Sequence, residues 1–96
     1  MTLNQLKYAI IVAESESFNE AAKKLFISQP SLSTSIHSLE EEIGVQIFRR
    51  SQNGIAVTPD GKEFIGYARQ VMEQYELLDA RYITCLLYTS DAADEL

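Results

Sequence analysis

Two prolines divide this chain, because proline is tolerated in a helix only within the first turn, where its missing N–H leaves no hydrogen bond unmade. Pro30 therefore places the start of one helix near Ser28 or Gln29. The aliphatic residues that follow recur at spacings of four, three and four, as on one buried helix face: Leu32, Ile36, Leu39 and Ile43. Gly44 suits the left-handed conformation after a last helical turn. The sequence thus predicts a helix over residues 28–43.

The second proline, Pro59, marks the start of a long helix. Thr58 is a candidate N-cap, and Asp60 places an acid in the first turn. Apolar and aromatic residues then recur at spacings of four, three, four, three and four: Phe64, Ala68, Val71, Tyr75, Leu78 and Tyr82. This is the a/d seam of a coiled coil over almost three heptads. We predict a linker and dimerisation helix over residues 59–84, whose seam contacts the same helix of a second subunit. Packing on the domain's own core is the alternative, and Phe64 is expected to do so in part.

Two shorter helices are predicted before Pro30. Thr2 is a candidate N-cap for the first helix. Its apolar stripe has spacings of three, four and three: Leu3, Leu6, Ile10 and Ala13. Asn19 then opens a run of good helix formers over residues 20–25, with Phe18 as an apolar plug before it. The second helix is therefore expected to be short.

After residue 44 the apolar period changes from helical to alternating. The alternating residues lie on both sides of a polar segment: Val45, Ile47, Ile55 and Val57. That segment contains Asn53 and Gly54, a pair typical of a β-hairpin turn. Because two strands alone are marginally stable, the predicted hairpin must pack against the helices.

Size and composition limit the classes of protein to which the chain can belong. Its 96 residues suffice for one small domain. The longest apolar run, residues 8–13, is far shorter than the roughly 20 residues of a membrane span, so we expect a cytoplasmic protein. A single cysteine, Cys85, excludes a disulfide framework and a four-cysteine zinc site. No nucleophile with a base, no phosphate loop and no metal cluster can be assembled, so neither an enzyme nor a cofactor is expected.

The net charge of −6 argues at first against binding to nucleic acid. The charge is unevenly distributed, however: residues 1–62 carry six Lys/Arg and seven Asp/Glu, whereas residues 63–96 carry two and seven. Basic residues occur as adjacent pairs, at 23–24 and 49–50. The acidic residues 40–42 are expected to form a solvated face. A weakly basic surface is therefore compatible with the acidic total.

Five separated motifs resemble the N-terminal winged helix-turn-helix domain of LysR-type transcriptional regulators. They are FNEAAKKL at 18–25, SQPSLS at 28–33, IHSL at 36–39 followed by Gly44, FRR at 48–50 and TPDG at 58–61. The resemblance covers residues 1 to about 84. It implies a mostly α fold, with a three-helix core and a two-stranded β wing over residues 1–58, followed by the linker/dimerisation helix. It also implies a bacterial regulator that binds double-stranded DNA as a homodimer. Family members carry a larger domain for a small-molecule effector, which this chain lacks.

The helix at residues 28–43 is the candidate for reading DNA in the major groove. Ala21 and Ala22 are small enough for the close packing that a helix-turn-helix requires. The predicted DNA-binding residues at this helix are Ser28, Gln29, Pro30, Ser31, Ser33, Thr34 and His37. An amide such as that of Gln29 can pair bidentately with adenine, a proline can touch a thymine methyl, and hydroxyls can bind base or phosphate. A solvated surface helix is the alternative interpretation.

The wing supplies the remaining predicted DNA contacts. By the family match, Arg50 is the first candidate for a contact with the DNA backbone and Arg49 is the alternative. Ordinary edge-strand charges are the competing interpretation of both arginines. Asn53 lies at the wing tip, where many relatives carry arginine, so strong binding in the minor groove is not expected.

Two function classes remain open on the sequence. The first is sequence-specific DNA binding by a regulator fragment, which the polar helix at 28–43 favours. The second is a helical dimerisation or protein-interaction module without specific DNA binding, which the acidic charge favours. Residues 85–96 break the heptad and resemble a translated sequencing adapter, so we expect a non-native tail.

Overall fold

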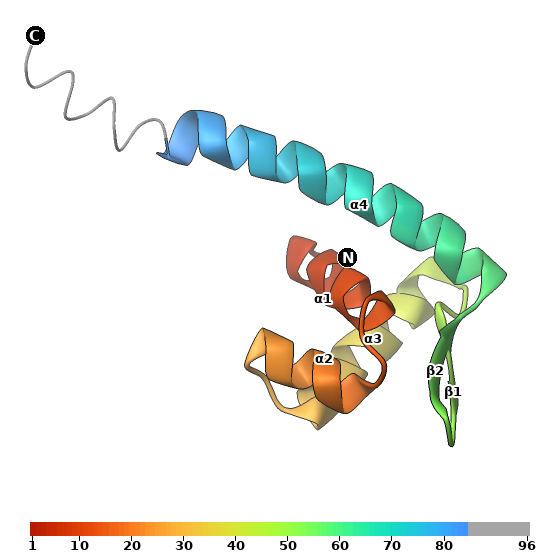
Figure 1. Ribbon diagram of the computed structural model, residues 1–96. Helices are drawn as coiled ribbons and strands as arrows, with labels where there is room; N and C mark the ends of the chain where they lie inside the picture. The colour runs from red at the N-terminus through yellow and green to blue at the C-terminus, as the bar shows by residue number, and fades with distance from the viewer. Residues whose placement is uncertain (85–96) are drawn as a thin grey trace, which may run out of the picture.

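The computed structural model describes residues 1–84, and the predicted tail at 85–96 lies outside the described residues. The elements, in chain order, are α1 (Leu3–Ala13), α2 (Phe18–Leu25), α3 (Gln29–Ile43), β1 (Phe48–Ser51), β2 (Gly54–Val57), α4 (Pro59–Asp79) and a π-helical turn, Ala80–Thr84 (Figure 1). The mostly α fold is confirmed: a three-helix core carries a two-stranded antiparallel wing and a long helix. Within the described part of the chain, no helix is both long and apolar enough to span a membrane.

The helices begin where side-chain oxygens cap their first N–H groups. Thr2 and Thr58 cap α1 and α4, as predicted, and Ser28 caps α3. The cap of α2 is Ser17, whose hydroxyl accepts a hydrogen bond from a backbone N–H of the first turn. The second helix therefore starts two residues before the predicted Glu20, and Phe18 is not a plug before the helix but part of its first turn.

The hairpin differs from its prediction in position. β1 starts at Phe48 and pairs with β2 from Phe48↔Val57 to Ser51↔Gly54, so Val45 and Ile47 precede the strand. Gly54 has a φ of 120° and is the first residue of β2, so the turn consists of the two residues before it. Ile47 is fully buried, which explains its apolar character without a place in the sheet.

The core lies where α1, α2 and α3 meet the base of the wing. It contains Ala9, Val12, Phe18, Ala21, Ala22, Leu32, Ile36, Leu39, Ile47, Phe48 and Ile65. The close packing predicted for Ala21 and Ala22 is present, since both are buried between α1 and α3. The aliphatic stripe of α3 faces this core, so its polar residues are left on the opposite side of the helix.

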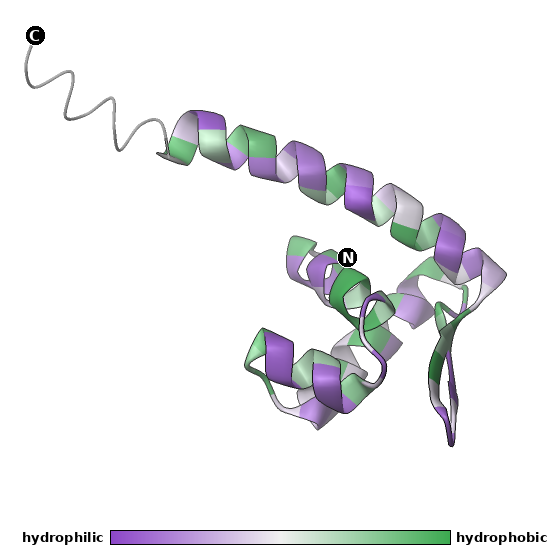
Figure 2. Ribbon diagram, in the orientation of Figure 1, coloured by the Kyte–Doolittle hydropathy of each residue, from purple (hydrophilic) through white to green (hydrophobic). Residues whose placement is uncertain are grey.

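The first half of α4 packs on the domain. The outer half still borders α1 through Met72, Tyr75 and Glu76, which line a hollow with residues of α1, and only its end extends past α1 (Figure 1). Phe64 is half-buried against the core and Ala68 is buried, so these two seam positions follow the alternative of packing on the domain itself. The other four seam residues are exposed: Val71, Tyr75, Leu78 and Tyr82. Apolar residues continue along this outer half (Figure 2). The seam is therefore divided between an intramolecular part and a part that faces solvent.

Candidate nucleic-acid interface

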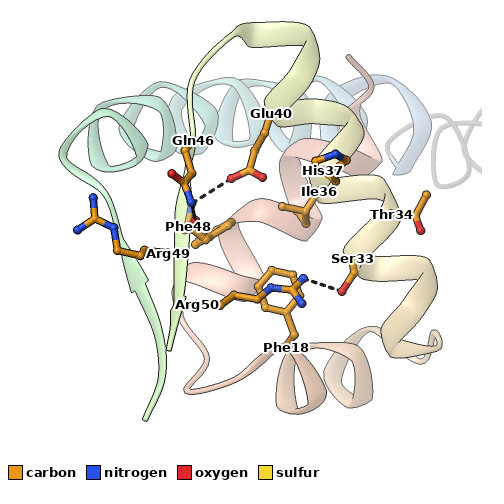
Figure 3. Close-up of a pocket in the computed structure, with 10 residues that line it drawn as sticks. All are labelled: Phe18, Ser33, Thr34, Ile36, His37, Glu40, Gln46, Phe48, Arg49 and Arg50. Carbon is orange, nitrogen blue, oxygen red and sulfur yellow. Dashed lines mark hydrogen bonds between the residues drawn. The ribbon is translucent and has the colours of Figure 1, made fainter. Parts of the chain in front are cut away.

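One face of α3 is polar and open to solvent. Pro30, Thr34, His37 and Glu41 follow at spacings of four, three and four, and all are exposed. Because this spacing matches the helical repeat, they form a single stripe opposite the buried residues. Ser31 is also exposed, whereas Gln29 and Ser33 are half-buried at one edge of the stripe. In Figure 3, Thr34 lies on the side of α3 away from β1, whereas His37 lies nearer the groove between α3 and β1.

The N-terminal turn of α3 is ordered by its own hydroxyls. The Ser28 hydroxyl accepts a hydrogen bond of 3.2 Å from the backbone N–H of Ser31 and donates one of 2.8 Å to the Ser31 hydroxyl. Ser28 thus has a structural role as N-cap, and its side chain still lies on the exposed surface. A polar group at this position can serve the helix and a ligand together.

A shallow groove of about 650 Å³ separates α3 from β1 (Figure 3). Its lining residues come from α2, α3, β1 and the segment before β1: Phe18, Ser33, Thr34, Ile36, His37, Glu40, Gln46, Phe48, Arg49 and Arg50. Five predicted DNA-binding residues therefore border one hollow: Ser33, Thr34, His37, Arg49 and Arg50. The fold joins the predicted helix contacts to the predicted wing contacts.

The two adjacent arginines of β1 point to different sides of the strand, as alternation in a strand requires (Figure 3). Arg50 reaches into the groove, where its guanidinium lies 3.8 Å from the centre of the Phe18 ring and donates a 2.7 Å hydrogen bond to the Ser33 hydroxyl. Arg49 extends away from α3. The two arginines, which were alternatives on the sequence, thus occupy separate environments.

Phe18 is a site residue that the sequence reasoning missed. Its ring meets the edge of the Phe48 ring at 6.0 Å between centroids and 88° between planes. The same ring carries the Arg50 guanidinium. A phenylalanine at the start of a helix gives no local signal of this role, because its partners lie some 30 residues further along the chain.

The acidic run in α3 does not form the uniform solvated face that was predicted. A carboxylate oxygen of Glu40 accepts hydrogen bonds from the backbone N–H groups of Ile47, at 2.7 Å, and Phe48, at 3.1 Å. Glu40 therefore fastens the wing base to α3. Glu41 pairs with His37 at 3.0 Å, and Glu42 contacts the N-terminal amine at 2.7 Å. Only Glu41 and Glu42 are exposed as expected.

The basic side chains near the helix-turn-helix differ in whether they form ion pairs within the domain. Lys24 is held by Glu20, at 3.2 Å, and by the Ser15 hydroxyl, at 3.2 Å. The backbone N–H of Glu16, together with the hydrogen bond and positive charge of Lys24, lowers the pKa of Glu20 below its ordinary value of 4.5. Within residues 1–84, Arg49 and Lys23 form no ion pair. These two cations are available to an anionic partner.

The wing tip carries little charge. Asn53 is exposed in the turn between β1 and β2, and the wing's positive charge is confined to β1. A Cβ atom added to Gly54 would lie 2.7 Å from the carbonyl oxygen of Glu16, so the wing lies close against the α1–α2 connection. Among the residues that the structure describes, no group of three or more His, Cys, Asp or Glu is placed to hold a metal ion.

The family model for bacterial regulatory helix-turn-helix proteins of the lysR family matches residues 3–62, which contain the whole helix-turn-helix, the wing and the start of α4. The chain belongs to the LysR family. Over 72 residues it is 43% identical to the transcriptional regulator TfdT of Cupriavidus pinatubonensis, a match that covers 75% of this chain and 32% of TfdT. Over 76 residues it is 41% identical to BenM of Acinetobacter baylyi, covering 79% of this chain and 25% of BenM. The chain thus spans about a quarter to a third of these LysR-family relatives.

Two solved structures match the LysR-family fold of this chain over almost its full described length. The DNA-binding domain of CbnR in complex with DNA has a TM-score of 0.82 at 36% identity, and the match covers 90% of this chain and 99% of that one. The DNA-binding domain of BenM bound to catB site 1 DNA has a TM-score of 0.84 at 36% identity, covering 90% and 97%. The resemblance drawn from the sequence motifs is confirmed, and the relatives are transcriptional regulators.

Proposed function

We propose that this chain binds a specific DNA sequence as the DNA-binding part of a transcriptional regulator, with α3 in the major groove. The observation that carries the proposal is the match to LysR-family domains solved in complex with DNA, at TM-scores of 0.82 and 0.84. This observation favours DNA binding over the alternative of a protein-interaction module. As a bacterial regulator of this kind, the protein would act in the cytoplasm and by binding, not by catalysis.

The geometry of α3 supports insertion into DNA. A major groove about 12 Å wide admits a single helix whose exposed side chains are short enough to bring its backbone close to the base edges. The exposed stripe from Pro30 to Glu41 contains no long apolar side chain. Gln29, at the edge of this stripe, is the proposed adenine contact, Pro30 the proposed thymine-methyl contact, and Ser28, Ser31, Ser33, Thr34 and His37 complete the proposed surface.

Phosphate contacts are proposed for the wing, beside α3. The Arg49 side chain extends away from α3 and forms no ion pair within residues 1–84, so its charge can neutralise a phosphate. Asn53 at the wing tip offers only a neutral amide, which suits a weak contact. We therefore expect modest non-specific affinity, with a negative dependence on salt.

The outer half of α4, together with the π-helical turn that follows it, is the proposed dimer interface. Val71, Tyr75, Leu78 and Tyr82 are between 41 and 57% exposed and share one helical seam, and a second copy would remove them from water. Phe64 and Ala68 already pack on the domain, so only the later seam residues of the proposed dimerisation helix are offered to a second copy. A dimer would place two α3 helices in major grooves about 34 Å apart. Effector binding is proposed only for a longer form of the protein.

A DNA titration tests the proposed function. Duplexes from upstream of the neighbouring genes are titrated with the parent, with Gln29→Ala and with Ser38→Ala, an exposed α3 serine outside the proposed contacts, at several salt concentrations. Loss of one good base contact costs about 1–3 kcal/mol, so Gln29→Ala should weaken specific binding by roughly 5- to 150-fold at an unchanged melting temperature. Ser38→Ala should bind as the parent does. A parent that binds no duplex even at low salt would support the interaction-module alternative instead.

A further inference from the structure

The Arg50 guanidinium makes two contacts with other side chains of the same domain. Its guanidinium lies over the Phe18 ring at 3.8 Å, and its Nη2 donates to the Ser33 Oγ at 2.7 Å. Phe18 is fixed in turn by its edge contact with Phe48. Three elements, α2, α3 and β1, thus converge on one arginine (Figure 3).

The hydrogen bonding continues from Ser33 to Gln29. The Gln29 Nε2 donates to the same Ser33 Oγ at 3.0 Å, so this oxygen accepts from two donors. A hydroxyl oxygen has two acceptor lone pairs, and both are occupied. Within residues 1–84, Gln29 Oε1 accepts no hydrogen bond. The amide of Gln29 is therefore oriented, with its nitrogen toward Ser33 and its oxygen available to a ligand.

We propose that Arg50 is a positioning residue for base recognition, because it fixes the amide of Gln29 through the hydroxyl of Ser33. The inference rests on the proposed function and adds a determinant of specificity to it. With Nε2 held at Ser33, Oε1 is the atom free to accept from an adenine N6 amino group, and the second N–H of Nε2 can donate to adenine N7. An amide turned by 180° would instead present its NH₂ group to the acceptors of guanine.

This role differs from that of an arginine that only binds a phosphate. To reach a phosphate, the Arg50 guanidinium would have to leave both the Phe18 ring and the Ser33 hydroxyl. Arg49 is the matched residue for that function, since it has the same charge, adjoins Arg50 in β1 and extends its side chain away from α3. A lysine at position 50 keeps the charge but has neither the planar group that stacks on a ring nor the rigid fork of donors.

The test is selection of binding sites from a random-sequence duplex library by the whole 96-residue chain. The parent, Gln29→Ala, Arg50→Lys and Arg49→Lys are compared, and Gln29→Ala identifies the base pair that depends on Gln29. At that position the parent should prefer adenine by roughly 5- to 150-fold, the range that 1–3 kcal/mol of discrimination gives. Arg50→Lys should lower this ratio by about fivefold or more. Arg49→Lys should leave the ratio unchanged.

A second measurement needs no DNA. The side-chain amide NMR signals of Gln29 should shift in Arg50→Lys and stay in place in Arg49→Lys. Unmoved signals in both variants would overturn the relay itself. A uniform loss of affinity in Arg50→Lys, with the adenine ratio retained, would overturn the positioning role and leave Arg50 as a phosphate contact. A parent that enriches no sequence would overturn the proposed function, and the role in base recognition with it.

Discussion

Gly61, in the first turn of α4, lies directly against the backbone of Ile47 at the base of the wing. A Cβ atom on Gly61 would lie 2.2 Å from the carbonyl oxygen of Ile47 and 2.9 Å from its carbonyl carbon and Cα. Ile47 is fully buried, and its carbonyl accepts the backbone N–H of Thr58 at 2.9 Å. The Gly61 N–H in turn donates to the Thr58 hydroxyl at 2.8 Å. Neither Gly61 nor Ile47 can move away without breaking these hydrogen bonds between the wing base and α4.

Gly61→Ala should therefore destabilise the domain. Overpacking costs about 1–3 kcal/mol, and the upper part of that range applies because the opposing atoms are backbone. The gain in helix propensity offsets at most about 1 kcal/mol. The net loss is about 2 kcal/mol, which lowers the melting temperature of a domain of this size by roughly 8–16 °C.

Gly66→Ala is the matched control, since it is the same substitution five residues later in the same helix. A Cβ atom there would meet nothing within 4 Å, and the position is exposed. Only the propensity gain remains, about 1 kcal/mol or a rise of roughly 4–8 °C. Thermal and urea unfolding of both variants at matched protein concentration measures the difference. Equal shifts in the two variants, or a stabilised Gly61→Ala, would refute the packing of α4 on the wing base described above.

Three further predictions follow from side chains on other elements. Glu40→Ala should lower the free energy of unfolding by about 1.5–3 kcal/mol, because two wing N–H groups lose a charged acceptor, whereas Glu41→Ala should change it by less than about 0.5 kcal/mol; urea denaturation compares them. The folded-state pKa of Glu20 is lowered, so the stability it adds is present above its ordinary value of 4.5 and is lost as the pH falls through the lowered pKa. The parent should thus exceed Glu20→Gln in urea midpoint at pH 7 and lose this advantage at acid pH; a constant difference would contradict the ion pair. Val71→Asp combined with Leu78→Asp should convert dimers to monomers in sedimentation experiments, because unpaired carboxylates would be buried at the seam, and a parent that is already monomeric at high micromolar concentration would contradict the proposed interface.

The sequence determined the features that depend on neighbouring residues. The caps at Thr2 and Thr58, the start of α3 next to Ser28 and the left-handed Gly44 each depend on residues within one turn of helix, so they were predicted correctly. The buried stripe of α3 was also predicted, because helical periodicity places it on one face whatever packs there. The strand start was misplaced because the burial of Ile47 imitates the alternation of a strand.

Tertiary structure decided the features that depend on atoms brought together from distant positions. Arg49 and Arg50 have the same side chain and are adjacent in sequence. Only the orientation of β1 relative to Phe18 decides that Arg50 stacks on that ring while Arg49 extends away from α3. Glu40 binds the base of the wing because the chain folds back and brings the backbone N–H of Ile47 to its carboxylate. The next acidic residue along the helix stays exposed. The apolar periodicity of α4 likewise showed which residues share one face of the helix. It did not show at which residue that face stops packing on the domain and becomes exposed. A local pattern fixes the direction of a side chain on its own element, and the partner that it meets there depends on how the other elements pack.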